Sequence, residues 1–203
     1  MRSVTTALAG TLLCVLFAGC GLLAQQRQGS PVPKPPAKAE VAINPAIFKD
    51  FQARLTRYVE LQRDVEKSTP PQQQTSDPSR IELAQKALGA KVRDLRKDAK
   101  QGDIFTPQIA AEFKRLINPE LKGEDGSDAR AVLKDDAPKP GEVLLKVNAD
   151  YPSGVLLPTV PSTILQALPT LPEDVEYRIV SQALLLRDVD ANIIIDFIPN
   201  AVR

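Results

Sequence analysis

The side chains that could do chemistry in this 203-residue chain are carboxylates, arginines and tyrosines, because histidine is absent. Without imidazole the chain can build neither a Ser-His-Asp nor a Cys-His nucleophile, and it lacks a common zinc ligand. The two cysteines are Cys14 and Cys20, and Met1 is the only methionine, so soft metals also lack ligands in the body of the chain. We therefore expect no catalytic residue, no metal and no cofactor, and we expect that the protein is not an enzyme.

One acidic motif imitates the opening of a calcium-binding loop: Asp188-Val-Asp190-Ala-Asn192. Ile193 stands where that loop needs glycine, and Pro199 stands where it needs glutamate. Aspartate and asparagine are also residues that turns select. We therefore predict a turn between two strands at this place.

Two pairs of adjacent acids could serve acid/base catalysis, Glu124-Asp125 and Asp135-Asp136. Both lie in a stretch rich in glycine and proline, without apolar neighbours that would raise a pKa, so we predict solvated loop acids. A hydrolase of cell-wall sugars that uses only carboxylates remains an alternative, because a pair of acids can catalyse glycoside chemistry without histidine. Such an enzyme needs two facing carboxyl groups about 5 to 10 Å apart.

The charge of the chain is balanced, with 26 basic and 25 acidic residues and a net charge of +1. Such a body creates no field that would collect nucleic acid, so we expect no nucleic-acid partner. One stretch is rich in basic residues, but Asp94 and Asp98 are interleaved with them, which is typical of a solvated helix face. The basic residues of this stretch are Lys91, Arg93, Arg96, Lys97 and Lys100.

The N-terminus has the pattern of an export signal, in which Met1-Arg2 precedes an uncharged run from Val4 to Ala24. The segment Phe17-Ala18-Gly19-Cys20 resembles the lipobox of bacterial lipoproteins. This resemblance implies that residues 1–19 are a signal peptide and that Cys20 carries the lipid. Cleavage after Ala24, which would release a soluble protein, and an uncleaved run that spans the bilayer are the alternatives.

All three alternatives place the rest of the chain outside the cytoplasm, facing the periplasm or the cell surface. Residues 20–42 then form the lipid attachment and a tether. The part from Gln25 to Lys38 is rich in proline and favours an extended chain. At about 3 Å per residue, it could hold the folded part roughly 40 Å from a membrane.

Three helices are predicted in residues 43–118, because apolar residues recur there at helical spacing and each start combines a capping residue with proline. The first two are similar in length and are joined by a short loop, so we expect an antiparallel helical hairpin. The predicted bounds are Asn44-Pro45 to before Pro70, Asp77-Pro78 to Gly102, and Thr106-Pro107 to Asn118-Pro119.

The remaining residues are predicted as a connector, 119–141, and a small β-rich region, 142–203, that packs on the helices. The connector could hold a short helix around Ala129 to Lys134. A strand is expected at Glu142–Val147 and one helical turn at Ser162–Leu168. An antiparallel meander follows in which helices or Leu-Pro segments must cover the second face, because its strands are apolar on both sides. Its strands are Glu176–Val180, Ala183–Arg187 and Asn192–Ile198, and the fold class is α+β.

Two stretches carry a resemblance to a family of exported bacterial proteins for which no activity can be carried over. The first is Gly102-Asp-Ile-Phe-Thr-Pro107, and the second runs from Tyr177 to Ala201 and reads YRIVSQALLLRDVDANIIIDFIPNA. The final meander is also loosely similar to small periplasmic proteins of nickel and cobalt homeostasis. Since the body has no His, Cys or Met, that likeness implies no metal site in this chain.

Together these features predict a lipid-anchored protein of the cell envelope that acts through protein contacts, as a binding module or a scaffold. Its expected partners are the membrane, reached through the lipid on Cys20, and an envelope protein. The alternatives are the carboxylate-only hydrolase and a periplasmic carrier that holds an apolar ligand between the helices and the sheet.

Overall fold

The computed structural model describes residues 43–68 and 76–203. The signal peptide, Cys20 and the tether lie outside these residues, so the expectations about them stay predictions. In the part of the chain that the structure describes, no helix combines the length and the apolar character needed to cross a membrane.

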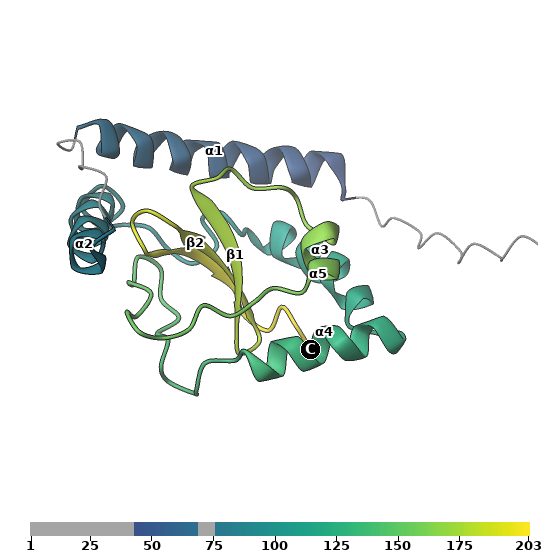
Figure 1. Ribbon diagram of the computed structural model, residues 1–203. Coiled ribbons are helices and arrows are strands. Elements are labelled where there is room, and N and C mark those ends of the chain that lie inside the picture. Colours follow the sequence, from purple (N-terminus) through teal and green to yellow (C-terminus); the bar gives the residue numbers. More distant parts are fainter. Residues whose placement is uncertain (1–42, 69–75) are drawn as a thin grey trace, which may run out of the picture. The chain divides into compact units, whose positions relative to one another are not determined.

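The fold class is α+β, as predicted: residues 43–68 and 76–203 hold five helices followed by a three-stranded antiparallel sheet (Figure 1). The helices are α1 (Pro45–Lys67), α2 (Pro78–Leu95), α3 (Pro107–Glu120), α4 (Gly123–Asp135) and α5 (Ser162–Ala167). The strands are β1 (Val175–Val180), β2 (Ala183–Asp188) and β3 (Ile194–Ile198), paired in the order β1-β2-β3.

The starts of the first three helices are where the sequence predicts them. The Asn44 side chain accepts hydrogen bonds from the N–H groups of Ala46 and Ile47, which caps α1. Asp77 and Thr106 cap α2 and α3 in the same way. A proline occupies the first turn of all three, where its missing N–H costs nothing.

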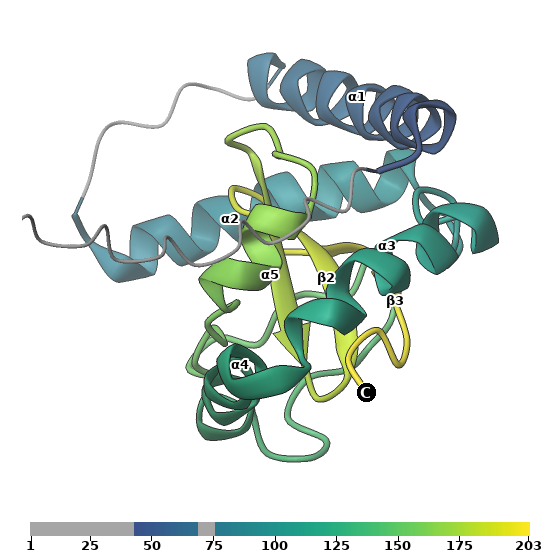
Figure 2. The same ribbon diagram turned by 90° about the vertical axis from the view of Figure 1, so that its right-hand side faces the viewer.

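The helices α1 and α2, which were expected to form an antiparallel hairpin, cross at a steep angle. Figure 1 shows α1 from the side and α2 along its axis, and Figure 2 shows α2 from the side. Instead of following α1, α2 packs on the connection between β2 and β3, where a Cβ on Gly89 would lie 2.8 Å from the Ala191 carbonyl oxygen. The predicted apolar stripe of α2 is therefore buried only in part: Leu88 and Val92 are buried, whereas Leu95 is 64% exposed.

The second helix ends at Leu95, so the prediction that it runs to Gly102 is wrong. Arg96 leaves the helical conformation, with φ −111° and ψ 24°. Its carbonyl accepts a hydrogen bond of 2.8 Å from the Asn148 side chain, and its guanidinium donates one of 2.8 Å back to Asn148. This pair of long-range bonds offers Arg96 partners that a longer helix would not.

One face of the sheet forms the main core with the helices. Phe51 of α1, Phe113 of α3 and Phe105, which precedes α3, cluster there, with ring centroids 5.0 to 5.9 Å apart. Tyr177 of β1 lies 6.2 Å from Phe113. Such edge-to-face and offset pairs add to the stabilisation that apolar burial provides. The cluster joins α1, α3 and the sheet into one body.

The segment 143–157 covers the second face of the sheet, which confirms the prediction that this face is covered. The strand predicted at Glu142–Val147 is not formed; only Asp150 makes an isolated bridge, to Ile193. Asn148 takes a left-handed conformation, with φ 64°, at the start of the short stretch 148–151 that hydrogen-bonds to Asn192 and Ile194. The residues of this smaller core are Val143, Tyr151, Val180, Ala183, Leu185 and Ile194.

The region 119–141 holds more helix than predicted. Pro119 lies inside the last turn of α3, so that helix passes the expected end at Asn118. The expected short helix at 129–134 is the C-terminal part of α4, and its Ala129 is buried in the main core. The expected helical turn at Ser162–Leu168 is α5.

Glu112 contacts the start of α1. Its Oε1 accepts a hydrogen bond of 2.7 Å from the Asn44 backbone N–H, and both of its oxygens accept from the Arg115 guanidinium. The hydrogen bonds from Arg115, together with the one from Asn44, lower the pKa of Glu112 to about 2 against the cost of its burial. The start of α1 is therefore tied to α3 by a charged contact.

Asp196 is fully buried in β3, and its carboxylate is surrounded by backbone donors. Gly102, Ile104 and Phe105 donate N–H hydrogen bonds of 2.8 to 3.2 Å to its oxygens. Phe197 donates a further one of 2.8 Å. These bonds hold the segment between α2 and α3 against the edge of the sheet and replace the water that a carboxylate needs.

We expect Asp196→Asn to destabilise the protein strongly. Asparagine keeps one acceptor oxygen but places an NH2 group against backbone donors. Since a hydrogen bond to a charged group is worth roughly 1.5–3 kcal/mol, the free energy of unfolding should fall by roughly 3 kcal/mol. Urea denaturation at pH 7 measures this loss. Asp94→Asn, at an exposed position of α2, is the control. Equal losses of stability in the two variants would contradict the role of the backbone hydrogen bonds around Asp196.

We expect Glu112→Gln to remove a pH-dependent part of the stability. Because the pKa of Glu112 is lowered from 4.5 to about 2 on folding, its contribution is complete above pH 4.5 and is lost as the pH falls towards 2. The variant should therefore be less stable by roughly 1–3 kcal/mol at pH 7 and equal to the wild type near pH 2. Urea denaturation at several pH values tests this, with the exposed Glu60→Gln as control. If the difference in free energy of unfolding between Glu112→Gln and the wild type does not change with pH, the prediction is wrong.

Candidate functional site

A polar groove lies between α1 and the segment that follows α2. Its volume is about 320 Å³. We call it the arginine groove and define it by the residues that line it: Arg54, Arg57, Tyr58, Leu61, Arg96, Ala99, Asp103 and Ile104. Positions 57 and 58 each lie three or four residues from both 54 and 61 along α1, so one face of this helix supplies a wall of the groove.

Arg96 is held in place by contacts on several sides. Its guanidinium lies 4.8 Å from the centre of the Tyr58 ring, which is within the range of a cation–π interaction. Nη1 donates to Asn148 and Nη2 donates to the Ile195 carbonyl, at 2.8 and 3.1 Å. Burial lowers the pKa of Arg96, but a guanidinium stays protonated in proteins, so the groove keeps this charge.

Tyr58 connects the groove to the sheet. Its hydroxyl donates to the buried Asp188 carboxylate at the end of β2, which also accepts an N–H bond of 2.6 Å from Ala191. Burial raises the pKa of Tyr58, and the negative charge of Asp188 raises it further. Burial also raises the pKa of Asp188, and the bonds from Tyr58 and Ala191 oppose this rise. The ring that supports Arg96 is thus itself anchored.

The two arginines of α1 differ in their partners. Arg54 donates to the Asp50 carboxylate at 2.9 Å and to the Asp103 carbonyl at 2.8 Å. Arg57 is exposed, and its Nε donates to the Ala53 carbonyl at 3.2 Å. Among residues 43–68 and 76–203, neither Arg57 nor Arg96 forms an ion pair with a carboxylate. No carboxylate of the described residues therefore lies within ion-pairing distance of these two guanidinium groups, although Asp196, Asp103 and Asp188 act on Arg96 electrostatically from further away.

A smaller pocket of about 190 Å³ lies between α2 and the connection of β2 to β3. Two carboxylates line it, Glu82 and Asp150, which is the arrangement that the hydrolase hypothesis asks for. Hydrogen bonds from Lys86 and Ser153 lower the pKa of Glu82, and Asp150 is paired with Arg93. A glycosidase needs one carboxylic acid that is still protonated at the working pH. Glu82 does not meet that need, and Asp150 is engaged in an ion pair with Arg93.

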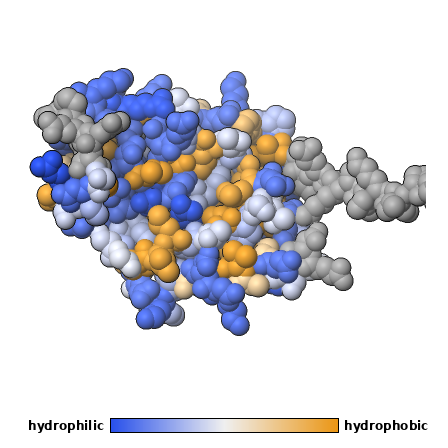
Figure 3. All heavy atoms as spheres, in the orientation of Figure 1, coloured by the Kyte–Doolittle hydropathy of each residue, from blue (hydrophilic) through white to orange (hydrophobic). Residues whose placement is uncertain are grey.

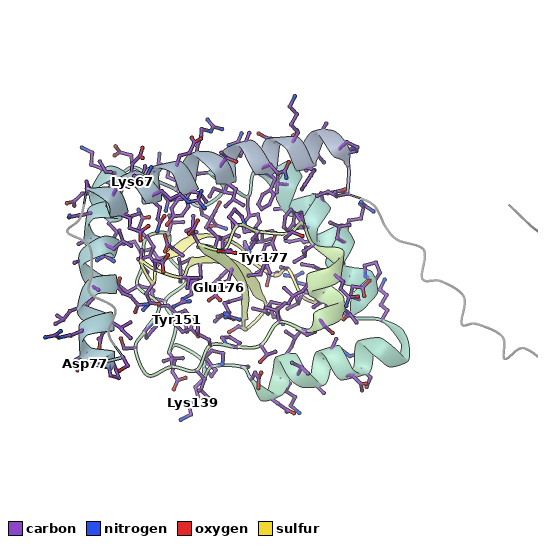
Figure 4. All side chains as sticks on the ribbon, turned by 45° about the horizontal axis from the view of Figure 1, so that its top comes forward. Lys67, Asp77, Lys139, Tyr151, Glu176 and Tyr177 are labelled. Atoms are coloured by element: carbon purple, nitrogen blue, oxygen red, sulfur yellow. The ribbon has the colours of Figure 1, made fainter. Side chains whose placement is uncertain are left out.

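A third polar cluster serves the second face of the sheet. Arg187 of β2 is buried and donates to Glu176 and to Asn192 at 2.5 to 3.0 Å, and Arg178 donates to the same Glu176. The Arg187 guanidinium also lies 5.7 Å from the ring of Tyr151, which Figure 4 shows close to Glu176. These contacts fix the covering segment on the sheet.

The face shown in Figure 3 has apolar surface that polar residues divide into several patches. Exposed leucines of the covering segment and α5 are Leu144, Leu156, Leu157 and Leu165. Leu156 is the most exposed of them, at 84%. The covering segment thus turns Val143, Leu145 and Val155 towards the sheet and neighbouring leucines towards solvent.

The sequence motifs fall outside the arginine groove. Asp188, Asp190 and Asn192 form the turn between β2 and β3, as predicted, and Asp188 uses its carboxylate to cap that turn. Asp135 and Asp136 are exposed where α4 ends, and the side chains of the other acid pair, like Cys20, lie outside the described residues. The structure, where it describes the chain, brings no three metal-binding side chains together.

Sequence reasoning missed the role of Arg96, because it lies in a run of mixed charge that is typical of a solvated face. The signal that could have found it is its spacing from Val92. A residue four positions after a buried one lies on the same side of a helix, so the Arg96 side chain starts out towards the core. Its partners Tyr58 and Asn148 are distant in sequence and give no local signal.

Comparisons with known proteins return no match to a family model, a curated protein or a solved structure. The resemblances that the sequence motifs indicate therefore stay predictions. The interpretation of the arginine groove rests on its geometry and its charges.

We expect Tyr58→Phe to destabilise the protein while keeping the aromatic ring below Arg96. The loss of the hydroxyl leaves an oxygen of the buried Asp188 without its donor, and a bond to a charged group is worth roughly 1.5–3 kcal/mol. Tyr177→Phe is the matched control, since its hydroxyl donates to the neutral Pro169 carbonyl and should be worth only about 1 kcal/mol. Urea denaturation at pH 7 compares the two variants. A larger loss for Tyr177→Phe would contradict the charged contact.

Proposed function

We propose that this chain is a non-enzymatic binding protein of the cell envelope, which is exported, anchored through a lipid on Cys20 and held off the membrane by residues 20–42. It acts through protein contacts, and the arginine groove is its contact site. The observation that carries the proposal is that Arg57 and Arg96 line one open groove and that, among the described residues, neither forms an ion pair with a carboxylate.

The chemistry of the groove supports binding over catalysis. Guanidinium groups stay protonated near neutral pH and so do not act as general bases, and the Tyr58 hydroxyl, whose pKa is raised, is engaged with Asp188. The lining holds one carboxylate, that of Asp103, and it accepts an N–H bond from Lys100. Arginines that are fixed in advance by other contacts bind an anionic partner at a lower entropic cost.

The position of α1 supports a tethered protein. This helix begins directly after the tether, at Asn44, and the Glu112 contact fixes its first turn on α3. The same helix carries Arg54, Arg57 and Leu61 of the groove. The lipid, the tether and the contact site would therefore follow one another along the chain, with the groove on the first folded element.

The two alternatives draw less support from the described residues. An apolar carrier needs an enclosed apolar cavity, but the space between the helices and the sheet is filled by fully buried side chains such as Phe51 and Phe113. The hydrolase needs a protonated acid next to a second carboxylate. In the pocket that holds Glu82 and Asp150, the pKa of Glu82 is lowered and Asp150 is paired with Arg93.

Site-specific photo-crosslinking in living cells tests this proposal. A benzophenone side chain at Ala99, in the groove, should give a discrete adduct with one envelope protein, whereas the same group at the exposed Ala131 of α4 should not. In parallel, Cys20→Ser should abolish incorporation of labelled fatty acid and release the chain from the membrane fraction. No adduct at position 99, or unchanged lipid labelling in Cys20→Ser, would overturn the corresponding half of the proposal.

A further inference from the structure

We infer that the outer edge of β1 pairs with β1 of a second copy of this chain, so that two three-stranded sheets join into one across a twofold axis at Tyr177. The stretch 156–159, which we call the strap, covers this edge and must move aside. The inference goes beyond the proposed function and does not involve the arginine groove.

Every second residue of β1 turns its backbone N–H and carbonyl away from β2. The Val189 N–H donates to the Asp174 carbonyl, so position 174 faces the chain of β2. Because this direction alternates along an antiparallel strand, Val175, Tyr177 and Ile179 face outwards. The Val175 N–H bonds to the loop that precedes β1, whereas no hydrogen bond within the described part of the chain reaches the backbone of Tyr177 or Ile179.

The strap covers this edge without bonding to it. It joins Val155, which packs on the smaller core, to Val160 in the main core, so it passes from one face of the sheet to the other (Figure 1). Tyr177 and Ile179 are 5% and 2% exposed. Pro158, the buried residue of the strap, has no N–H to donate. Backbone groups that are covered without a partner cost stability, and a strand in place of the strap regains their hydrogen bonds.

The strap is held by polar contacts near its two ends. The Leu156 carbonyl accepts a hydrogen bond of 2.9 Å from the Tyr151 hydroxyl, and the Thr159 N–H donates one of 3.3 Å to the exposed Asp136 carboxylate. Leu156 and Leu157 are exposed, so they add little to either core. The strap can therefore leave the edge while the residues on both sides of it stay in the two cores.

The charges of β1 select one register for the two copies. A twofold axis can centre the pairing on Glu176, Tyr177 or Arg178. An axis at Glu176 places this residue opposite itself, and an axis at Arg178 does the same with that residue, and like charges directly opposite one another destabilise a sheet. The axis at Tyr177 places each Glu176 opposite Arg178 of the second copy, which is the favourable arrangement.

This register uses groups that are in place. The two copies of Tyr177 would exchange N–H and carbonyl bonds, and each Ile179 N–H would reach the Val175 carbonyl of the other copy. Within one copy, Arg178 donates to Glu176, and both side chains are 23% exposed. The two copies can therefore exchange these ion-pair partners at the surface.

Cysteine trapping in living cells tests the register, because the chain has no cysteine after Cys20. Opposed residues that do not exchange backbone hydrogen bonds have Cα atoms about 4.5 Å apart, which allows a disulfide. Co-expressed Glu176→Cys and Arg178→Cys chains should give a disulfide-linked dimer under mild oxidation, and neither variant alone should. The control pairs Arg178→Cys with Glu173→Cys, an exposed position before β1. No dimer from the first pair, or an equal yield from the control, would overturn the inference.

Charge exchange between copies gives a second test, by native mass spectrometry of the full-length lipoprotein with detergent micelles in excess. Arg178→Glu and Glu176→Lys should each weaken self-association by about tenfold, because each places like charges opposite one another twice. Mixing the two variants restores both opposite-charge pairs, so a heterodimer should form with the affinity of the wild type. Arg80→Glu, at an exposed position of α2, is the control and should associate normally. If the two variants are folded by circular dichroism and form no heterodimer, the inference is wrong.

Hydrogen exchange tests the role of the strap. When the protein concentration is raised, the amides of Tyr177 and Ile179 should gain protection, while those of Leu157 and Thr159 should lose it. Unchanged exchange at these four amides in a sample that has dimerised would show that the copies meet elsewhere and would contradict the inference.

Discussion

A carboxylate buried in the last strand organises the part of the chain that forms one wall of the arginine groove. Asp196 sits in an otherwise apolar strand, and an ion in such a place is costly unless it is fully hydrogen-bonded. The backbone of Gly102, Ile104 and Phe105 supplies the bonds. The segment between α2 and α3, which has no regular structure of its own, is thereby fixed, and with it Asp103 and Ile104 of the groove.

The opposite wall depends on a second buried acid. Asp188 ends β2 and holds the Tyr58 hydroxyl, which places the Tyr58 ring below Arg96. The two acids thus anchor the two sides of the groove to the same three-stranded sheet. Side chains that are held by such bonds lose little further freedom when a partner binds, and this is the physical reason why the groove suits recognition.

The sequence predicts those parts of the fold that depend on neighbouring residues. Asn44-Pro45, Asp77-Pro78 and Thr106-Pro107 start helices because a cap and a proline act within one turn, and the apolar runs of β2 and β3 act within one strand. The end of α2 coincides with the contact of Arg96 with Asn148, 52 positions away, and the segment that holds the absent strand at 142–147 pairs with β3 from Asn148 onward. No local pattern reports such a contact, so both boundaries were wrong.

The site was hidden for a related reason. Net charge and charge runs describe a chain before its acids and bases find partners, and here they indicated a neutral body with a solvated helix face. Folding pairs many of the charges, as with Arg54 and Asp50 or Arg187 and Glu176, and leaves Arg57 and Arg96 together in one groove. A balanced composition therefore excludes a long-range field, but it does not exclude a local excess of charge. That excess becomes visible only after the internal pairs have been assigned in three dimensions.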